Sequence, residues 1–335
     1  MTASDRLRWH DPVWQEQAQD WIRRQAAEKA IHLEGEIEQP HAYAWSTVMR
    51  VRSDAGWLYF KATSPETVYE AGLTRALADW QPDCLPELLA LDEARGWMLM
   101  RDGGQQLRAS IRPTKDIRPW QPVIRRYAEL QINLAGRAPA ILALGIPDCR
   151  LEVLPGLYAQ LLNDADSLMP GQEKGLSADE FAKLQALEVR FAGICADLAA
   201  YGLPVSLDHG DFHDGNILLR GERITFFDWG DASLTHPFVS LRTFFVSIEI
   251  ALELDDYAFT PEMADLLELY LQPWQGFAPR EALLAAYRLS KPVAAIVKAL
   301  SWRRTISRLS GDLHAEYAWI VPEVLREFMV YEKML

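Results

Sequence analysis

The spacing of apolar and polar residues predicts a helix followed by a small sheet in the first third of the chain. Asp11 and Pro12 are typical of a helix start, and the apolar residues behind them recur at helical spacing to about residue 29. Ser64 and Pro65 resemble a second helix start, with an apolar stripe that ends near Trp80. The predicted strands, each bounded by turn residues, are 31–39, 45–52, 56–63, 85–89 and 96–100.

The pattern changes at residues 101–104, Arg-Asp-Gly-Gly, where we place a hinge between two domains. Beyond this point apolar residues recur at helical steps, first over about 120–134 and again from Ser177, a good cap, to about Tyr201. A chain of 335 residues exceeds the size at which one hydrophobic core keeps growing. We therefore predict an α+β protein with a small N-terminal domain, 1–102, built on an antiparallel sheet, and a larger, mainly helical domain, 103–335.

The stretch 207–231 carries the candidate chemistry. Two strand-like runs flank a turn at 220–223, which predicts a β-hairpin that brings its outer neighbours Asn216 and Asp228 close together. Mg²⁺ prefers oxygen ligands and takes few of them from protein, so this pair predicts a magnesium site. Asp211, on the loop before the hairpin, would accept a proton or a hydrogen bond from an incoming hydroxyl.

Three interpretations compete for this stretch. In the first interpretation, the Asp, Asn and Gly residues only form turns, where they are common for conformational reasons alone. A metallohydrolase is the second interpretation, in which alternating histidines and aspartates converge on zinc; its ligands would be His209, Asp211, His213 and Asp214. The joint spacing of the aspartates and the asparagine favours the third interpretation, phosphoryl transfer.

The letters HGDFHDGN at 209–216, followed by FDWGD at 227–231, resemble the paired signature of the aminoglycoside phosphotransferase and choline kinase superfamily, relatives of the protein kinases. The resemblance implies a bilobal protein-kinase-like fold. It also implies an ATP-dependent phosphotransferase that phosphorylates a hydroxyl of a small molecule and uses Mg²⁺, with GTP as an alternative donor. A nucleotide-binding regulator without transfer activity is the alternative function.

The same resemblance assigns roles to residues of the signature. Asp211 becomes the catalytic aspartate, and Asn216 and Asp228 become the metal ligands. His209 and His213 would support the loop, although histidines in tight polar loops are often simply hydrogen-bonded. Asp231 would support the metal loop or serve only the turn.

Lys61 on a predicted strand and Glu70 on the following helix resemble the lysine and glutamate that kinases pair. A lone lysine on a strand is usually a solvated residue, so this assignment comes from the resemblance. The resemblance implies that Lys61 binds the ATP phosphates and that Glu70 forms an ion pair with Lys61. Glu66 is the alternative partner, because the spacing from Lys61 to Glu70 is short for the superfamily.

No GxGxxG motif is present, and residues 39–41 are Gln-Pro-His where protein kinases place glycines. Ser46 or Thr47 could bind phosphate instead through hydroxyl and backbone N–H groups, or could be ordinary strand residues. In the superfamily the backbone at the end of the 96–100 strand binds adenine. The resemblance therefore places Met100 and Arg101 at the nucleotide, while Met100 could equally be a core residue.

The amino-acid composition limits the classes of molecule that we expect the protein to bind. The residues are 49% apolar and 24% charged, as in ordinary soluble proteins, and the net charge of −13 argues against nucleic acids and anionic membranes. Three widely spaced cysteines indicate neither a disulfide framework nor a metal site. No signal peptide or membrane-length apolar run is evident, so we expect a cytoplasmic protein with a small-molecule substrate.

The segment 243–279 contains no lysine or arginine and seven acidic residues, with Tyr257, Phe259 and Trp274 among them. Acidic and aromatic residues together favour a cationic acceptor, but a solvated helix face over buried aromatics is the alternative. A basic run follows that could form ion pairs with this segment. Its members are Lys298, Arg303, Arg304 and Arg308.

Overall fold

The computed structural model describes residues 8–309 and 311–335, which form two compact units. Unit 1 contains the chain up to Gln106 together with Gly215–Gly230 and Leu309–Leu313. Unit 2 contains Leu107–Asp214, Asp231–Arg308 and His314–Leu335. The chain therefore returns to unit 1 for a short segment within the stretch that carries the candidate chemistry.

Unit 1 is built on a five-stranded sheet in the order β1-β2-β3-β5-β4, in which all neighbouring strands are antiparallel. Each predicted strand is present, but the fourth begins at Leu88 rather than Leu85. Pro86 lies between these positions, and proline lacks the N–H that a sheet ladder uses. The strands are β1 (Leu33–Ala42), β2 (Ser46–Ser53), β3 (Gly56–Thr63), β4 (Leu88–Asp92) and β5 (Trp97–Arg101).

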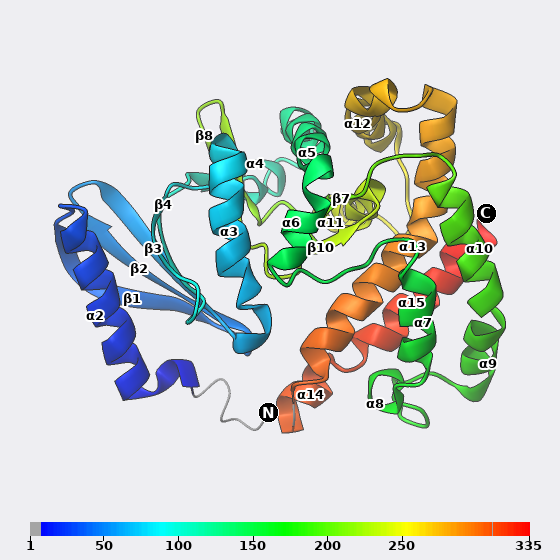
Figure 1. Cartoon of the computed structure of the whole chain (residues 1–335), viewed down its shortest axis with the longest axis horizontal. Helices are drawn as coiled ribbons and strands as arrows, with labels where there is room; N and C mark the ends of the chain where they lie inside the picture. Colours follow the sequence, from blue (N-terminus) through cyan, green and yellow to red (C-terminus); the bar gives the residue numbers. More distant parts are fainter. Residues whose placement is uncertain (1–7, 310) are drawn as a thin grey trace. The chain divides into compact units, whose positions relative to one another are not determined.

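The two faces of this sheet have different neighbours. Side chains alternate along a strand, and Phe60 of β3 lies in a buried core with Trp21 of α2 (Pro12–Glu28). Lys61, the next residue, therefore lies on the opposite face, where Glu70 of α3 (Tyr69–Trp80) contacts it. Figure 1 shows α2 in dark blue and α3 in cyan on opposite sides of the sheet.

Of the two helix starts predicted for unit 1, one is confirmed and the other is wrong. Asp11 caps α2 as predicted, because its carboxylate accepts two backbone N–H groups of the first turn at 2.8 and 3.0 Å. The second α-helix begins at Tyr69 and not at Ser64. A 3₁₀ turn, Pro65–Thr67, comes first, and the Ser64 side chain makes no capping hydrogen bond.

The predicted hairpin is present in unit 1. It consists of β8 (Ile217–Arg220) and β9 (Arg223–Phe226), and β6 (Gln105–Gln106) adds a third strand beside β8. Gly221 adopts a φ of 59° in the two-residue loop, a left-handed conformation that suits the twist of a hairpin. The alternation of strand and turn residues thus predicted this element correctly.

Unit 2 is mainly helical, as expected from the 3.6-residue pattern. Its longest helix, α13 (Arg280–Ile306), packs along α15 (Ile320–Lys333), and the two are orange and red in Figure 1. A two-stranded antiparallel ribbon joins β7 (Ser206–Asp208) to β10 (Ser233–Thr235). Asp211 lies three residues after the end of β7, so this ribbon and the helices around it position the candidate catalytic loop.

The predicted helix from Ser177 to about Tyr201 is two helices, with a break at Leu187. The Ser177 cap is confirmed and forms a reciprocal capping box with Glu180. No glycine or proline marks the break, so the sequence pattern did not reveal it. The remaining helices are α4 (Arg108–Ile111), α5 (Trp120–Leu134), α6 (Ala138–Ala143), α7 (Leu154–Leu162), α8 (Ala165–Leu168), α9 (Ala178–Ala186), α10 (Glu188–Ala199), α11 (Leu241–Leu252), α12 (Pro261–Leu271) and α14 (Gly311–Tyr317). None of the helices described is both long and apolar enough to cross a membrane.

Candidate active site

In unit 1, one buried lysine contacts two carboxylates. Lys61 Nζ lies 2.6 Å from Glu70 Oε1 and 2.5 Å from Asp228 Oδ1. Burial alone would lower the pKa of Lys61, but the charges of Asp228 and Glu70 outweigh it and raise this pKa. Burial raises the pKa of Glu70 to about 7 despite the lysine, since one ammonium group serves two carboxylates. The side chain of Glu66, the alternative partner, lies outside the described part of the structure.

Helix α3 is also tied to the residues after β9. The Trp229 N–H donates to Glu70 Oε1 at 3.1 Å, and the Tyr69 hydroxyl donates to the Gly230 carbonyl at 2.5 Å. Asp228 has a φ of 66°, which is uncommon for a residue with a side chain and is typically maintained by surrounding contacts at functional sites. These contacts fix the direction of the Asp228 carboxylate, which is about half exposed.

Asn216 and Asp228 flank the hairpin as predicted from the sequence. The Phe227 N–H donates to the Asn216 carbonyl at 3.2 Å, so the backbone pairing continues beyond the last ladder residues. Asn216 is buried, at 6% exposure, whereas the Asp228 side chain is exposed at 46%. One carboxylate and one amide at the base of a hairpin form a donor set that suits Mg²⁺.

The register of the sheet separates the predicted phosphate-binding residues. Ser46 shares the face of Lys61, since Val48 pairs with Lys61 and Ser46 lies two residues before Val48. Thr47 lies on the α2 face, where its hydroxyl donates to the His41 carbonyl at 2.7 Å and accepts from Gln39 at 2.9 Å. We therefore do not assign a phosphate-binding role to the Thr47 side chain.

The same alternation applies at β5. Met98 is the sheet partner of Lys61, so Met100 lies on the Lys61 face. Arg101 lies on the other face, and its guanidinium pairs with Glu87 at 3.0 Å. The backbone N–H groups of Arg101 and Asp102 donate to carbonyls within unit 1 and are not available to a nucleotide base. Met100 therefore remains a candidate for the nucleotide site, and the Arg101 side chain does not.

In unit 2, the Asp211 carboxylate is contacted on both oxygens. His213 Nε2 lies 3.0 Å from Oδ2, and Lys298 Nζ lies 3.4 Å from Oδ1 and donates to the Gly210 carbonyl at 2.9 Å. Burial opposes ionisation of Asp211, but the charge of Lys298 and the hydrogen bond from His213 outweigh it and lower the pKa of this carboxylate. Asp211 is therefore ionised at neutral pH.

The loop around Asp211 is held by side chains at its start. His209 is fully buried; its N–H donates to the Tyr127 hydroxyl at 3.0 Å, and its Nδ1 accepts from the Asp211 N–H at 3.4 Å. Gly210 has a φ of 75°, and a Cβ here would lie 2.1 Å from the Asp231 carbonyl oxygen, so only glycine fits. Asp231 accepts a hydrogen bond from Ser301 at 2.9 Å. The supporting roles of His209 and Asp231 stay predictions.

The zinc interpretation finds little support in the geometry. Asp214 is buried and engaged by Arg112, which donates to both of its oxygens at 2.9 and 3.2 Å. His213 Nδ1 faces Arg108 at 3.3 Å and its Nε2 faces Asp211. Among the residues that the structure describes, no group of three or more His, Cys, Asp or Glu side chains is arranged to hold a metal ion.

Lys298 was not identified as a site residue from the sequence. Its basic neighbourhood suggested ion pairs with the acidic segment 243–279, but Lys298 contacts the Asp211 loop and Arg303 pairs with Asp164 at 2.6 Å. That suggestion is wrong for these two residues. A lysine 87 positions from its partner carries no local sequence signal that could have indicated the contact.

A small antiparallel sheet with a buried lysine–glutamate pair, together with a mainly helical unit, defines a phosphotransferase of protein-kinase-like fold. The chain belongs to the phosphotransferase enzyme family, whose model matches residues 58–295. This confirms the predicted superfamily and the predicted α+β fold class.

Solved structures of small-molecule kinases share this fold. An ethanolamine kinase of Plasmodium vivax has a TM-score of 0.59 at 15% identity, covering 94% of this chain and 86% of that protein. A choline kinase of Cryptosporidium parvum has a TM-score of 0.59 at 13% identity, covering 90% and 89%. A macrolide 2'-phosphotransferase of Brachybacterium faecium has a TM-score of 0.55 at 17% identity, covering 90% and 98%. No curated protein matches the sequence.

Proposed function

We propose that this protein transfers the γ-phosphoryl group of ATP to a hydroxyl of a small molecule. The observation that carries the proposal is the pairing of Lys61 with both Glu70 and Asp228, the latter 167 residues away in the chain. Kinases use such a lysine to hold the nucleotide phosphates and such a glutamate to hold the lysine. Ser46 and Met100, on the same face of the sheet, would extend the nucleotide site, and GTP is the alternative donor.

Asn216 and Asp228 would hold the Mg²⁺ ion that accompanies the nucleotide. The exposed carboxylate of Asp228, held in direction by Lys61 and its left-handed backbone, fits such a role, as does the amide at the other end of the hairpin. When bound, the ion neutralises negative charge on the phosphate oxygens.

Asp211 would orient the acceptor. In the transfer, the bond from the γ-phosphorus to the bridging oxygen of ATP breaks and its electron pair stays on ADP, a bond to the acceptor oxygen forms, and the hydroxyl proton passes by way of the Asp211 carboxylate to water. Because its pKa is lowered, the Asp211 carboxylate is a weak base that acts mainly by accepting a hydrogen bond from the hydroxyl until the proton departs. Phosphoryl transfer through a loose transition state depends on this positioning more than on early proton removal.

The direct experiment is a screen of small hydroxyl compounds for ATP-dependent product, read by mass spectrometry and ADP formation. An Asp211→Asn variant should lose about 10²–10⁴-fold in kcat while retaining nucleotide binding. Asp197→Asn, at an exposed aspartate of the same unit, is the matched control and should keep full activity. Full activity in Asp211→Asn would refute the assignment. Nucleotide binding without product from any acceptor would instead favour a regulator without transfer activity.

A further inference from the structure

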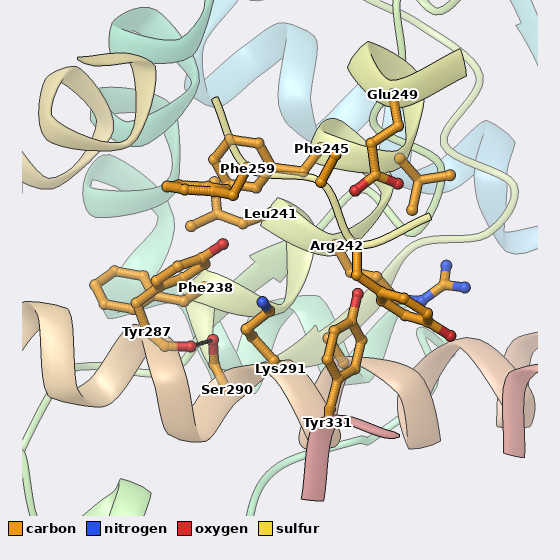
Figure 2. Close-up of a pocket in the computed structure, with 14 residues that line it drawn as sticks. Phe238, Leu241, Arg242, Phe245, Glu249, Phe259, Tyr287, Ser290, Lys291 and Tyr331 are labelled. Carbon is orange, nitrogen blue, oxygen red and sulfur yellow. Dashed lines mark hydrogen bonds between the residues drawn. The ribbon is translucent and has the colours of Figure 1, made fainter. Parts of the chain in front are cut away.

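A hollow in unit 2 is walled by aromatic side chains and contains two ionisable groups. It lies between α11, α13 and the C-terminal half of α15, with Phe259 at one side (Figure 2). Its volume is about 30 Å³, far below the roughly 300–1,000 Å³ of sites that hold a whole small molecule. This size suits one part of a molecule. The aromatic residues of its wall are Phe238, Phe245, Tyr257, Phe259, Tyr287 and Tyr331.

Lys291 projects from α13 into this hollow between Tyr287 and Tyr331, as Figure 2 shows. Its Nζ lies 4.8 Å from the ring centre of Tyr331 and 5.9 Å from that of Tyr287. Among the described residues, no carboxylate oxygen lies within 4.0 Å of this nitrogen and no hydrogen-bond acceptor contacts it. Burial lowers the pKa of Lys291, against the opposing effect of Glu249 and Glu327 at longer range. The hollow thus contains a partly buried ammonium group without a direct anionic partner.

The other basic groups nearby are already paired. Arg242, which also lines the hollow, donates to both oxygens of Glu327, with Nε–O distances of 2.9 and 3.0 Å. Lys298, two turns further along α13, contacts Asp211. Among the described residues that line the hollow, Lys291 is therefore the cation without an ion-pair partner.

Glu249 points into the hollow from α11 (Figure 2). Burial, together with the charges of Asp256 and Glu327, raises the pKa of Glu249 to about 7 against the opposing charges of Lys291 and Arg242. A protonated carboxyl group can donate a hydrogen bond. At and below neutral pH the hollow therefore combines an ammonium group with a carboxyl group able to donate.

This arrangement argues against a cationic group in the hollow. Aromatic walls favour cations, but here the ammonium of Lys291 already occupies the position beside the tyrosines. Of the acidic segment, Glu253 pairs with Lys115 at 2.6 Å and Glu268 pairs with Arg280 at 2.8 Å. Glu249 is the acidic residue of that segment that lines the hollow.

The hollow shares two wall residues with a smaller hollow beside the Asp211 loop. These are Arg242 and Ala294, and the wall of the smaller hollow includes Gly210 and Lys298. Lys291 and Lys298 are seven residues apart on one helix face, which corresponds to about 10 Å along the axis. A molecule that reaches both places would span about that distance.

We propose that Lys291 binds a carboxylate group of the acceptor, so that the substrate is a hydroxy acid whose hydroxyl lies at Asp211. The identification of the bound molecule as the acceptor rests on the proposed function. A carboxylate carries one charge and matches one ammonium group with one neutral carboxyl donor. A phosphate dianion would need a second unpaired cation, and Arg242 is engaged by Glu327.

The probe is ω-hydroxyoctanoate, compared by calorimetry with its methyl ester and with ω-aminooctanol, without nucleotide. The carboxylate should bind at least about tenfold more tightly than either analogue, the difference expected for a charge-assisted hydrogen bond. Lys291→Met should abolish this preference, and Lys183→Met, at an exposed lysine of α9, should preserve it. Binding should weaken from about pH 6 to about pH 8 as Glu249 ionises, and Glu249→Gln should remove that weakening.

Tighter binding of the amine, or an unchanged preference in Lys291→Met, would overturn the proposal. If Lys291→Met does not fold, the difference in affinity between the carboxylate and its methyl ester on the unaltered protein tests the proposal. Binding of the hydroxy acid, with no ATP-dependent product from it or from any acceptor in the screen, would refute the proposed function and leave the carboxylate site standing. Phosphorylation of uncharged alcohols with no binding of the hydroxy acid would do the reverse.

Discussion

Lys298 Nζ lies 3.4 Å from Asp211 Oδ1 and donates a hydrogen bond to the neighbouring Gly210 carbonyl at 2.9 Å. The lysine comes from the middle of α13 and is mostly buried, with 13% of its side chain exposed. An ammonium group has three donors, so it can make both of these contacts at once. In the proposed reaction Lys298 would thus hold the Asp211 carboxylate in place and keep it ionised.

Replacing Lys298 should change both the rate and its pH dependence. Lys298→Met is expected to lower kcat by about 10²–10³-fold, the range for loss of one preorganised charge donor. Burial raises the pKa of Asp211 and Lys298 lowers it, so without the lysine this pKa should rise. The acid limb of the kcat profile should then move to higher pH, because the ionised carboxylate is the active form. Lys298→Arg should recover part of the rate. If Lys298 had a purely structural role, the acid limb of the kcat profile would lie at the same pH in Lys298→Met as in the unaltered protein.

Removing Lys61 should destabilise unit 1 because two carboxylates lose their shared cation. Lys61→Met is expected to reduce the free energy of unfolding by about 3 kcal/mol, as for other broken buried pairs. Burial already raises the pKa of Glu70 to about 7, so this residue can protonate, and the loss should be smaller in acid than in alkali. Urea denaturation at two pH values measures this. The Lys61→Met/Glu70→Gln double variant should be more stable than Lys61→Met, and equal stability would contradict the shared-cation explanation.

Loss of Asp228 should weaken the binding of magnesium nucleotides more than that of free nucleotides. In calorimetry, Mg²⁺ should increase the affinity for ADP in the unaltered protein, and Asp228→Asn should reduce this gain at least about tenfold. Asp83→Asn, an exposed aspartate of unit 1, serves as the control. If Mg²⁺ strengthened ADP binding equally in both variants, Asp228 would not be a metal ligand.

Glu180 should stabilise unit 2 in a pH-dependent manner. The hydrogen bonds from Arg326 and from the Ser177 backbone lower its pKa to about 2. The stabilisation is therefore complete above the usual glutamate pKa of about 4.3 and is lost as pH falls towards 2. Because both side chains are partly exposed, Glu180→Gln should cost roughly 1 kcal/mol at neutral pH and little at acidic pH. Chemical denaturation with Glu173→Gln as a control checks this, and an equal cost at both pH values would exclude the ion pair as its cause.

Local signals in the sequence correctly predicted the hairpin and several helix starts. The turn residues at 220–223 predicted the hairpin, and Asp11 and Ser177 marked the starts of their helices. These features depend on interactions within a few residues, such as a cap accepting nearby N–H groups. The break at Leu187 and the late start of α3 at Tyr69 lacked such signals, so the sequence pattern missed them.

The faces of the sheet limited the sequence prediction for the nucleotide site. Ser46 and Thr47 were equally good candidates, as were Met100 and Arg101. Because side chains alternate along a strand, one member of each pair had to point away from Lys61. The register of β3 with β2 and β5 identified Thr47 and Arg101 as those members.

The sequence by itself determined the order of helices and strands, the family signature and the candidate set of Lys61, Glu70, Asp211, Asn216 and Asp228. The tertiary structure alone decided which charges meet. It paired Lys61 with Asp228, placed Lys298 on Asp211 and left Lys291 in an aromatic hollow without a direct anionic partner. The reason is that a local pattern reflects backbone preferences over a few residues. Ion pairing and burial instead depend on which distant segments pack together, and that depends on the whole fold.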